Sequence, residues 1–112
     1  MIYRHQWKDH VAIYNHTDRG FCKLTEFDAR GQRVACLHDL VVYPRKRGQG
    51  FGRELLAWAI GRATVDGCDA LILWPGGEPW VEAWYKRNGF KESRAYESED
   101  GEPCLMLKII QG

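Results

Sequence analysis

The sequence lacks several features that would mark a secreted, metal-binding or membrane protein. Its four cysteines form no CxxC pair and show no zinc-ligand spacing, so we expect free thiols and no zinc or other metal site. The opening residues, MIYRHQWKDH, contain no apolar stretch typical of a signal peptide. All apolar runs are far shorter than the roughly 20 residues of a membrane span. These features favour a cytoplasmic protein without membrane contact.

An excess of charge of one sign is also missing. Sixteen Lys and Arg side chains face fifteen Asp and Glu, which leaves a net charge of +1 and disfavours a nucleic-acid partner. Basic residues gather only locally, at Arg45, Lys46, Arg47 and Arg53, which indicates a small anion bound at one spot. A length of 112 residues with 45% hydrophobic content predicts a single domain over residues 1–112.

Local periodicity predicts an α/β fold with a mixed sheet. Alternating or continuously apolar segments indicate strands at 11–14, 21–28, 33–43, 70–74, 90–97 and 104–110. Apolar residues three and four apart indicate helices at 50–65 and 79–88. The strand, helix and strand between 33 and 74 predict a right-handed crossover that joins two parallel strands.

The segment VVYPRKRGQGFGRELL, residues 41–56, places Gly48, Gly50 and Gly52 between a strand and a helix. Glycine in a helical turn costs up to about 1 kcal/mol relative to alanine, so these positions need another reason. Backbone N–H groups of such a loop point at one spot, and glycine lets an anion approach them closely. Arg47 and Arg53 would add charge-assisted bonds. The segment predicts a phosphate or pyrophosphate site, although a tight turn alone would explain one or two of the glycines.

Two motifs resemble the GNAT superfamily of N-acetyltransferases. RKRGQGFGRELLAWAI resembles its acetyl-CoA signature, Arg/Gln-x-x-Gly-x-Gly/Ala, with Arg47, Gly50 and Gly52 on the motif positions. LHDLVVYP, before it, resembles the central strand, and EAWYKRNGF, 82–90, resembles the second signature. The resemblance covers about half the chain. It implies a mixed, mostly antiparallel sheet, flanked by helices, whose central parallel strands splay apart for acetyl-CoA.

The resemblance also implies roles for individual residues, with acetyl-CoA as the co-substrate. The pyrophosphate would be held by the loop that consists of Arg47, Gly48, Gln49, Gly50, Phe51, Gly52 and Arg53. The strand end at Leu40, Val41 and Val42 would pair with the pantetheine amides. Tyr85 matches the tyrosine that protonates the departing thiolate, with a role as a core aromatic as the alternative.

His38 is the first choice for the base that takes a proton from the attacking amine. It resembles an active-site histidine of the arylalkylamine acetyltransferases, and histidine titrates in the range that a general base needs. A half-buried structural histidine is the alternative, and a water relay without a single base is another. Weaker choices are Glu26, Asp28 and Asp39; Asp39 faces away from His38 unless a β-bulge intervenes.

The chain departs from the family at Glu78, where an asparagine is common, and in its short N-terminal third. Glu78 and Glu26 are carboxylates that a cationic acceptor would suit. Without the usual pair of helices, the acceptor site is either open, which suits a protein or peptide amine, or completed by a second subunit in a homodimer. Trp74, Trp80 and Trp84 are expected beside the cleft.

These features lead to two functions of different classes. The first is an N-acetyltransferase that moves acetyl from acetyl-CoA to a primary amine, of a small molecule, peptide or protein, by direct attack in a ternary complex. The second is a module of the same fold that binds coenzyme A or another protein without catalysis.

Overall fold

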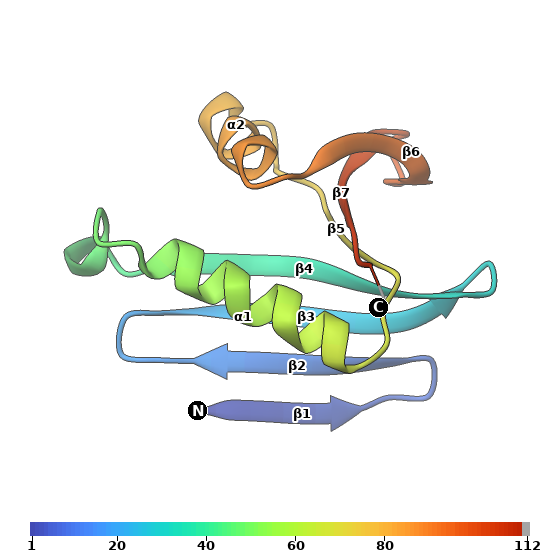
Figure 1. Ribbon diagram of the computed structural model, residues 1–112, viewed down its shortest axis with the longest axis horizontal. Helices are drawn as coiled ribbons and strands as arrows, with labels where there is room; N and C mark the ends of the chain where they lie inside the picture. The colour runs from blue at the N-terminus through green and yellow to red at the C-terminus, as the bar shows by residue number, and fades with distance from the viewer. Residues whose placement is uncertain (111–112) are drawn as a thin grey trace.

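Seven strands and two α-helices make up the computed structural model, which describes residues 1–110 of the chain (Figure 1). The strands are β1 (Ile2–Gln6), β2 (His10–His16), β3 (Gly20–Ala29), β4 (Gln32–Val42), β5 (Ala70–Leu73), β6 (Lys91–Glu97) and β7 (Pro103–Lys108). The helices are α1 (Phe51–Val65) and α2 (Pro79–Arg87), and a 3-10 turn spans Pro44–Lys46.

All seven strands lie in one sheet, in the order β1-β2-β3-β4-β5-β7-β6. Neighbouring strands are antiparallel except β4 and β5, which run parallel and are connected through α1. The structure confirms the expected mixed, mostly antiparallel sheet with a central parallel pair. The predicted strands and helices are found with ends shifted by about two residues at most.

The sequence patterns do not predict β1. All five of its residues are exposed, and it pairs only with β2 at the edge of the sheet. A strand is recognised in a sequence by the alternation of buried and exposed positions, and an edge strand without a buried face lacks this alternation. Its existence depends on the hydrogen bonds that β2 offers.

The larger core lies on the face of the sheet that α1 crosses (Figure 1). Leu55, Leu56, Ala59 and Ala63, spaced three and four residues apart, are the buried residues of α1. Burying one leucine side chain contributes roughly 1.5–3 kcal/mol, so this face holds α1 firmly against the sheet. Within residues 1–110, no helix has the length and apolar character that a membrane crossing requires.

A smaller core lies on the opposite face, near the β3–β4 hairpin. It consists of Val34, Cys36, Ala70, Ile72 and Cys104, with Phe27, Trp74, Tyr96 and Met106 packed against it. The hairpin reaches β6, because Arg30 Nη1 donates to the Ala95 carbonyl at 2.7 Å and its guanidinium lies 5.5 Å from the Tyr96 ring. All four cysteines of the chain are buried, and none of them forms a disulfide.

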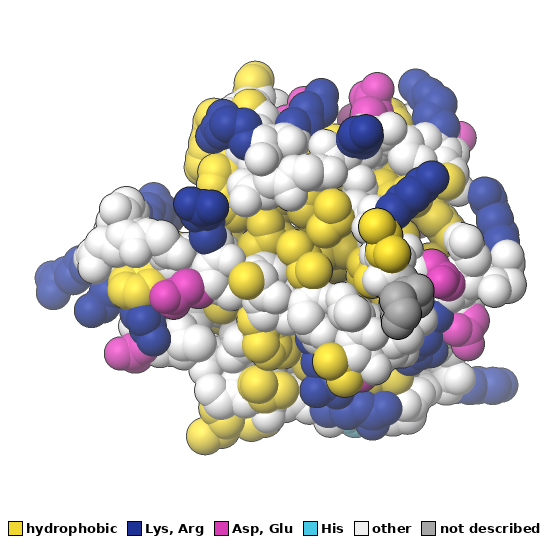
Figure 2. Space-filling model, viewed as in Figure 1, with side chains coloured by type: hydrophobic (Ala, Val, Ile, Leu, Met, Phe, Trp, Pro, Cys, Tyr) yellow, Lys and Arg dark blue, Asp and Glu magenta, His cyan; other side chains and the backbone are white. Residues whose placement is uncertain are grey.

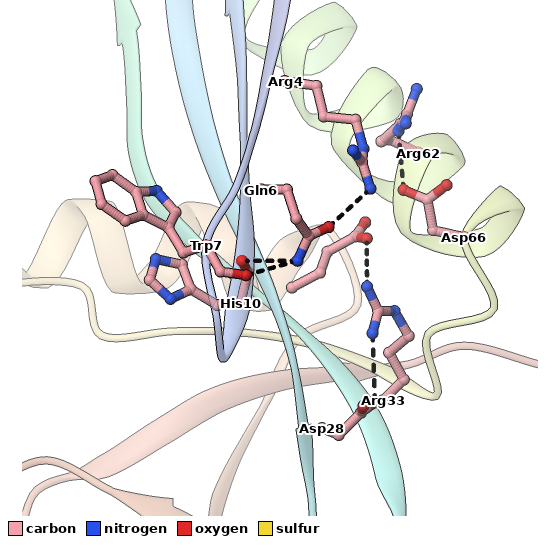
Figure 3. Close-up of polar contacts among 9 residues, drawn as sticks. Arg4, Gln6, Trp7, His10, Asp28, Arg33, Arg62 and Asp66 are labelled. Atoms are coloured by element: carbon pink, nitrogen blue, oxygen red, sulfur yellow. Dashed lines mark hydrogen bonds and ion pairs between the residues drawn. The ribbon is translucent and has the colours of Figure 1, made fainter.

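A buried carboxylate, Glu26, lies on the α1 side of the sheet. Its side chain is 2% exposed, with Oε1 3.4 Å from Arg33 Nη2, and Oε2 has no hydrogen-bond partner within the described chain. Figure 3 shows Arg33 bound to Asp28 as well, and Asp66 at the end of α1 bound to Arg62. Burial, and then the nearby Asp66 carboxyl, raise the pKa of Glu26 to about 7.

This raised pKa predicts a pH-dependent stability that Glu26→Gln removes. The unfolded chain loses the Glu26 proton near pH 4.5, whereas the folded chain keeps it to about pH 7. The Glu26 contribution to stability is therefore complete below pH 4.5 and is lost as the pH rises to about 7. Urea unfolding at several pH values should show this decline for the parent protein and a flatter profile for the variant.

The matched control is Glu99→Gln, because Glu99 lies in the exposed turn between β6 and β7. In this variant the free energy of unfolding should decline with pH as steeply as in the parent protein. Identical slopes for the parent and for Glu26→Gln would contradict the assignment of the raised pKa to Glu26.

Candidate active site

The two parallel strands separate beyond the centre of the sheet. Their pairing runs from Val34 opposite Ala70 to Cys36 opposite Ile72, and β5 ends at Leu73. β4 continues to Val42, so its last residues pair with β3 on one edge and with no described strand on the other. A free strand edge can form main-chain hydrogen bonds with an extended ligand. This separation is the splay that the family resemblance implies.

A cleft of about 570 Å³ opens where the strands separate. Figure 2 shows hydrophobic side chains gathered in the hollow between the part of the molecule that holds α2 and the part that holds α1. The cleft is lined by Leu40, Val41 and Val42 of β4, by Lys46, Arg47, Gly48 and Gly50 of the following loop, by Phe51, Gly52 and Arg53 of α1, and by Trp80, Val81, Trp84 and Tyr85 of α2.

The three glycines of the loop have two different structural roles. Gly48 and Gly50 have φ values of +76° and +86°, in the left-handed region that other residues rarely adopt. Gly52 is helical and has no such requirement. A Cβ on Gly52 would point toward the cleft, 3.7 Å from Trp84 and Val42. Only Gly52 therefore fits the expectation that a bare backbone serves close approach of a ligand, whereas Gly48 and Gly50 are needed to turn the chain.

The first turn of α1 presents unpaired hydrogen-bond donors to the cleft. Gly50 precedes the helix without a side-chain cap, and the first helical hydrogen bond is from Glu54 N to Gly50 O. The N–H groups of Phe51, Gly52 and Arg53 come before that bond and have no partner within the helix. Together with the positive end of the helix dipole, these groups form a site for an anion such as a phosphate.

Basic side chains surround this helix end. Lys46, Arg47 and Arg53 line the cleft, and Arg47 Nε donates to the Val42 carbonyl at 3.1 Å, which ties the loop to the end of β4. Phe51 is held on its other side by Arg19, whose guanidinium lies 4.4 Å from the ring. Gln49 does not line the cleft; its side chain faces the Arg45 carbonyl.

Tyr85 forms the inner end of the cleft. Its side chain is 8% exposed and packs edge-on against Trp84 and Phe90. Burial, with a smaller effect of Cys22, raises the pKa of the phenol to about 12. The phenol therefore holds its proton at neutral pH. Within residues 1–110, no hydrogen bond engages the hydroxyl, which leaves its proton available to a ligand in the cleft.

His38 lies on the face of β4 away from α1, the same face as Val34 and Cys36, and a β-bulge occurs at this residue. Lys23 pairs with Asp39 and Leu24 pairs with Leu37, so His38 is the extra residue between them. The Thr25 hydroxyl and His38 Nε2 share a hydrogen bond of 2.7 Å. Because of the bulge, Asp39 follows His38 on the same face, contrary to the expectation for a regular strand.

The charges around His38 act in both directions. Although His38 is exposed, its neighbours remove part of the hydration of the ring; this partial desolvation and the Lys23 ammonium lower the pKa of the imidazole, His10 lowers it further, and Asp39 opposes them. The net direction is downward, so His38 is neutral at pH 7 and can accept a proton. Within the described residues, no group of three or more His, Cys, Asp or Glu is arranged to hold a metal ion.

Three residues expected near the site lie elsewhere. Glu26 is buried beneath α1 beside Arg33 and cannot meet an incoming amine, so we do not retain it as an acceptor contact. Trp74 packs in the smaller core, and its Nε1 donates to the Glu102 carbonyl at 3.2 Å. Glu78 is exposed just before α2 and does not line the cleft.

Reasoning from the sequence did not connect two further residues with the candidate site. Thr25 meets His38 only through the register of β3 and β4, which no local pattern reveals. Val81 lines the cleft one residue after Trp80. Its position in the second signature segment was visible, but a lone valine on a short helix carries no functional signal.

Comparison with known proteins shows the family of this chain. Residues 6–92 match the family model described as acetyltransferase (GNAT) domain. No curated protein matches the sequence. Solved structures with a similar fold do exist, and some of them contain coenzyme A.

Three of these structures illustrate the likeness. The PaiA N-acetyltransferase from Thermoplasma acidophilum, in complex with coenzyme A, has a TM-score of 0.66 at 21% identity over 90% of this chain and 62% of its own. The ribosomal-protein-S18-alanine N-acetyltransferase from Escherichia coli has a TM-score of 0.61 at 23% identity, over 93% of this chain and 72% of its own. The NatC complex bound to Gag peptide and coenzyme A has a TM-score of 0.64 at 18% identity, over 90% of this chain and 71% of the matched chain. At these low identities, the TM-scores show a shared fold and nothing more. The chain spans less than two thirds of the Thermoplasma protein.

The environment of His38 predicts a titration that NMR can follow. The ring-proton shift of His38 should have its midpoint below 6.5, because partial desolvation and Lys23 disfavour the imidazolium. Lys23→Gln should raise this midpoint, since one positive neighbour is removed. Lys8→Gln, in the exposed turn after β1, is the control and should leave it unchanged. A His38 midpoint above 6.5 in the parent would contradict the described geometry.

Proposed function

Because the chain belongs to the GNAT acetyltransferase family, we propose that it is an acetyl-CoA-dependent N-acetyltransferase acting on a primary amine. One observation carries the proposal: the donor-rich start of α1, the free edge of β4 and the buried phenol of Tyr85 all line a single cleft. Coenzyme A has a matching series of parts, namely a pyrophosphate, a chain with two amides and a thioester.

The residues of the cleft fit coenzyme A in charge and in hydrogen bonding. The N–H groups at the start of α1 and the side chains of Arg47 and Arg53 would hold the pyrophosphate. The free edge of β4 from Leu40 to Val42 would pair with the pantetheine amides, as an added strand does. The apolar wall formed by Val81 and Trp84 would cover the pantetheine arm.

When bound, the coenzyme supplies an acetyl group activated as a thioester. A backbone N–H of β4 near Val41 would donate to the thioester carbonyl oxygen and stabilise the negative charge that develops there. Tyr85 would donate its phenolic proton to the sulfur as the carbon–sulfur bond breaks. Its raised pKa ensures that the proton is present at neutral pH.

The amine would approach from the face of β4 that carries His38. Neutral His38 would take a proton from the amine, directly or through a water molecule, as the new carbon–nitrogen bond forms. Thr25 would orient the ring through its hydrogen bond to Nε2. In this scheme Tyr85, which gives a proton to the sulfur, and His38, which takes a proton from the amine, lie on opposite sides of β4.

The primary amine belongs to a small molecule, a peptide or a protein, and the open face beside His38 favours the last two. His38 and Asp39 are both exposed, and no helix from residues 1–110 covers them. A protein acceptor would bring its own surface to cover this face, and a second subunit is the other way to complete it.

Coenzyme A binding is predicted to depend on the bare backbone at Gly52. Gly52→Asp should keep the fold, because Gly52 is helical, its Cβ would make only ordinary van der Waals contacts with Trp84 and Val42 at 3.7 Å, and an acidic residue suits a helix start. The added carboxylate should repel the pyrophosphate and weaken binding at least about tenfold by calorimetry.

Gly61→Asp is the matched control, since Gly61 lies in the same helix with nothing within 4 Å of its Cβ. It should bind coenzyme A as the parent does. Equal binding by Gly52→Asp and Gly61→Asp would place the ligand elsewhere. Binding without turnover of any amine would favour a module without catalysis.

Tyr85 and His38 are predicted to affect different parts of the reaction. Tyr85→Phe keeps the packing with Trp84 and Phe90 and should lower kcat about 100-fold without a change in the KM for acetyl-CoA. His38→Gln should remove the acidic limb of the kcat/KM profile. In the parent this limb should lie below pH 6.5, since the pKa of His38 is lowered and activity requires the neutral ring. An unchanged pH profile in His38→Gln would favour the water relay.

A further inference from the structure

Trp80 is the most exposed aromatic side chain of the described chain, with 70% of its surface accessible. It follows Pro79 in the first turn of α2, so its backbone is held in the helix. It lines the cleft together with Lys46 and Arg47 of the glycine loop. A rigid indole in this position leaves most of its apolar surface in water, and contact with a ligand ring would remove that surface from water.

The residues of α2 become more buried from the mouth of the cleft to its inner end. Trp80 is 70% exposed, Trp84 is half-buried, and Tyr85 is 8% exposed. Trp80 and Trp84 are four residues apart and so lie on the same side of the helix. Trp84 lies beside Gly52 at the start of α1, which fixes the level of the anion site along the cleft. Trp80 lies one helical turn closer to the mouth of the cleft than Trp84 and the anion site.

We propose that Trp80 stacks on the adenine ring of coenzyme A. This inference rests on the proposed function, which places the thioester at Tyr85 and the pyrophosphate at Gly52. Beyond the pyrophosphate the coenzyme has one ribose and then a planar purine, and Trp80 is the side chain at that end with a matching flat surface. Lys46 lines the same cleft, and its ammonium suits the 3′-phosphate of that ribose.

Stacking on Trp80 makes affinity depend on the nucleotide half of the ligand. A base stacked on an aromatic side chain loses affinity by about tenfold when that side chain becomes alanine. The pantetheine half does not reach Trp80 in this arrangement. A ligand that lacks adenosine should therefore bind the parent and the variant equally well.

The test is calorimetric titration with coenzyme A and with 4′-phosphopantetheine, which has no adenine. Trp80→Ala should bind coenzyme A about tenfold more weakly than the parent and should bind 4′-phosphopantetheine equally well. Trp80→Phe should keep most of the affinity for coenzyme A, because a flat ring remains. Trp7→Ala is the matched control, because Trp7 is 53% exposed in the turn after β1 and does not line the cleft.

The outcomes separate this inference from the proposed function. A parent protein that binds no coenzyme A overturns the proposed function and the assignment of Trp80 with it. A parent that binds, with Trp80→Ala binding equally tightly, overturns the assignment of Trp80 alone. An equal loss of both ligands in Trp80→Ala would mean that the indole supports the shape of the cleft, and it also overturns the adenine contact.

Discussion

The end of the β4–β5 pairing at Cys36 and Ile72 is the constraint on which the site depends. If the two strands paired along their full length, the edge of β4 would be used up and the cleft would close. The separation is stable because other contacts hold each strand. β3 pairs with β4 to its end, β7 pairs with β5, and α1 and α2 fill the same core on one face. The sheet therefore stays intact on both sides of a local gap.

The bulge at His38 gives the two faces of β4 different chemistry. Beyond it, Leu40 and Val42 face α1 and contribute to the cleft, whereas His38 and Asp39 both face the opposite side. One strand thus presents an apolar wall with a free backbone edge on one side and a titratable pair on the other. In the proposed reaction, this separation keeps the coenzyme and the amine on different sides of the strand, so that they meet only at the gap.

Much of the coenzyme side of the site was predictable from the sequence, because its residues are contiguous. The loop from Arg47 to Arg53 is read from local glycine spacing, and of these residues only Gln49 does not line the cleft. The acceptor side was less predictable. The sequence suggested His38, which stays a proposal, but it did not suggest Thr25, and it placed Glu26 at the site although Glu26 is buried beneath α1. The positions of Thr25 and Glu26 depend on the strand face that each occupies and on the register between β3 and β4, which no local pattern reveals.

The sequence by itself determined the local elements: the strand, glycine loop and helix of the proposed anion site, and the helix that carries Tyr85. These follow from backbone conformation and hydrophobic period, which neighbouring residues dictate. Only the tertiary structure decided that β1 adds to the sheet edge, that Trp74 packs in the smaller core while Trp80 stays exposed at the cleft, and that β5 stops short of β4. These features arise from pairing and packing between segments distant in the chain, whose free energy no local stretch of sequence contains.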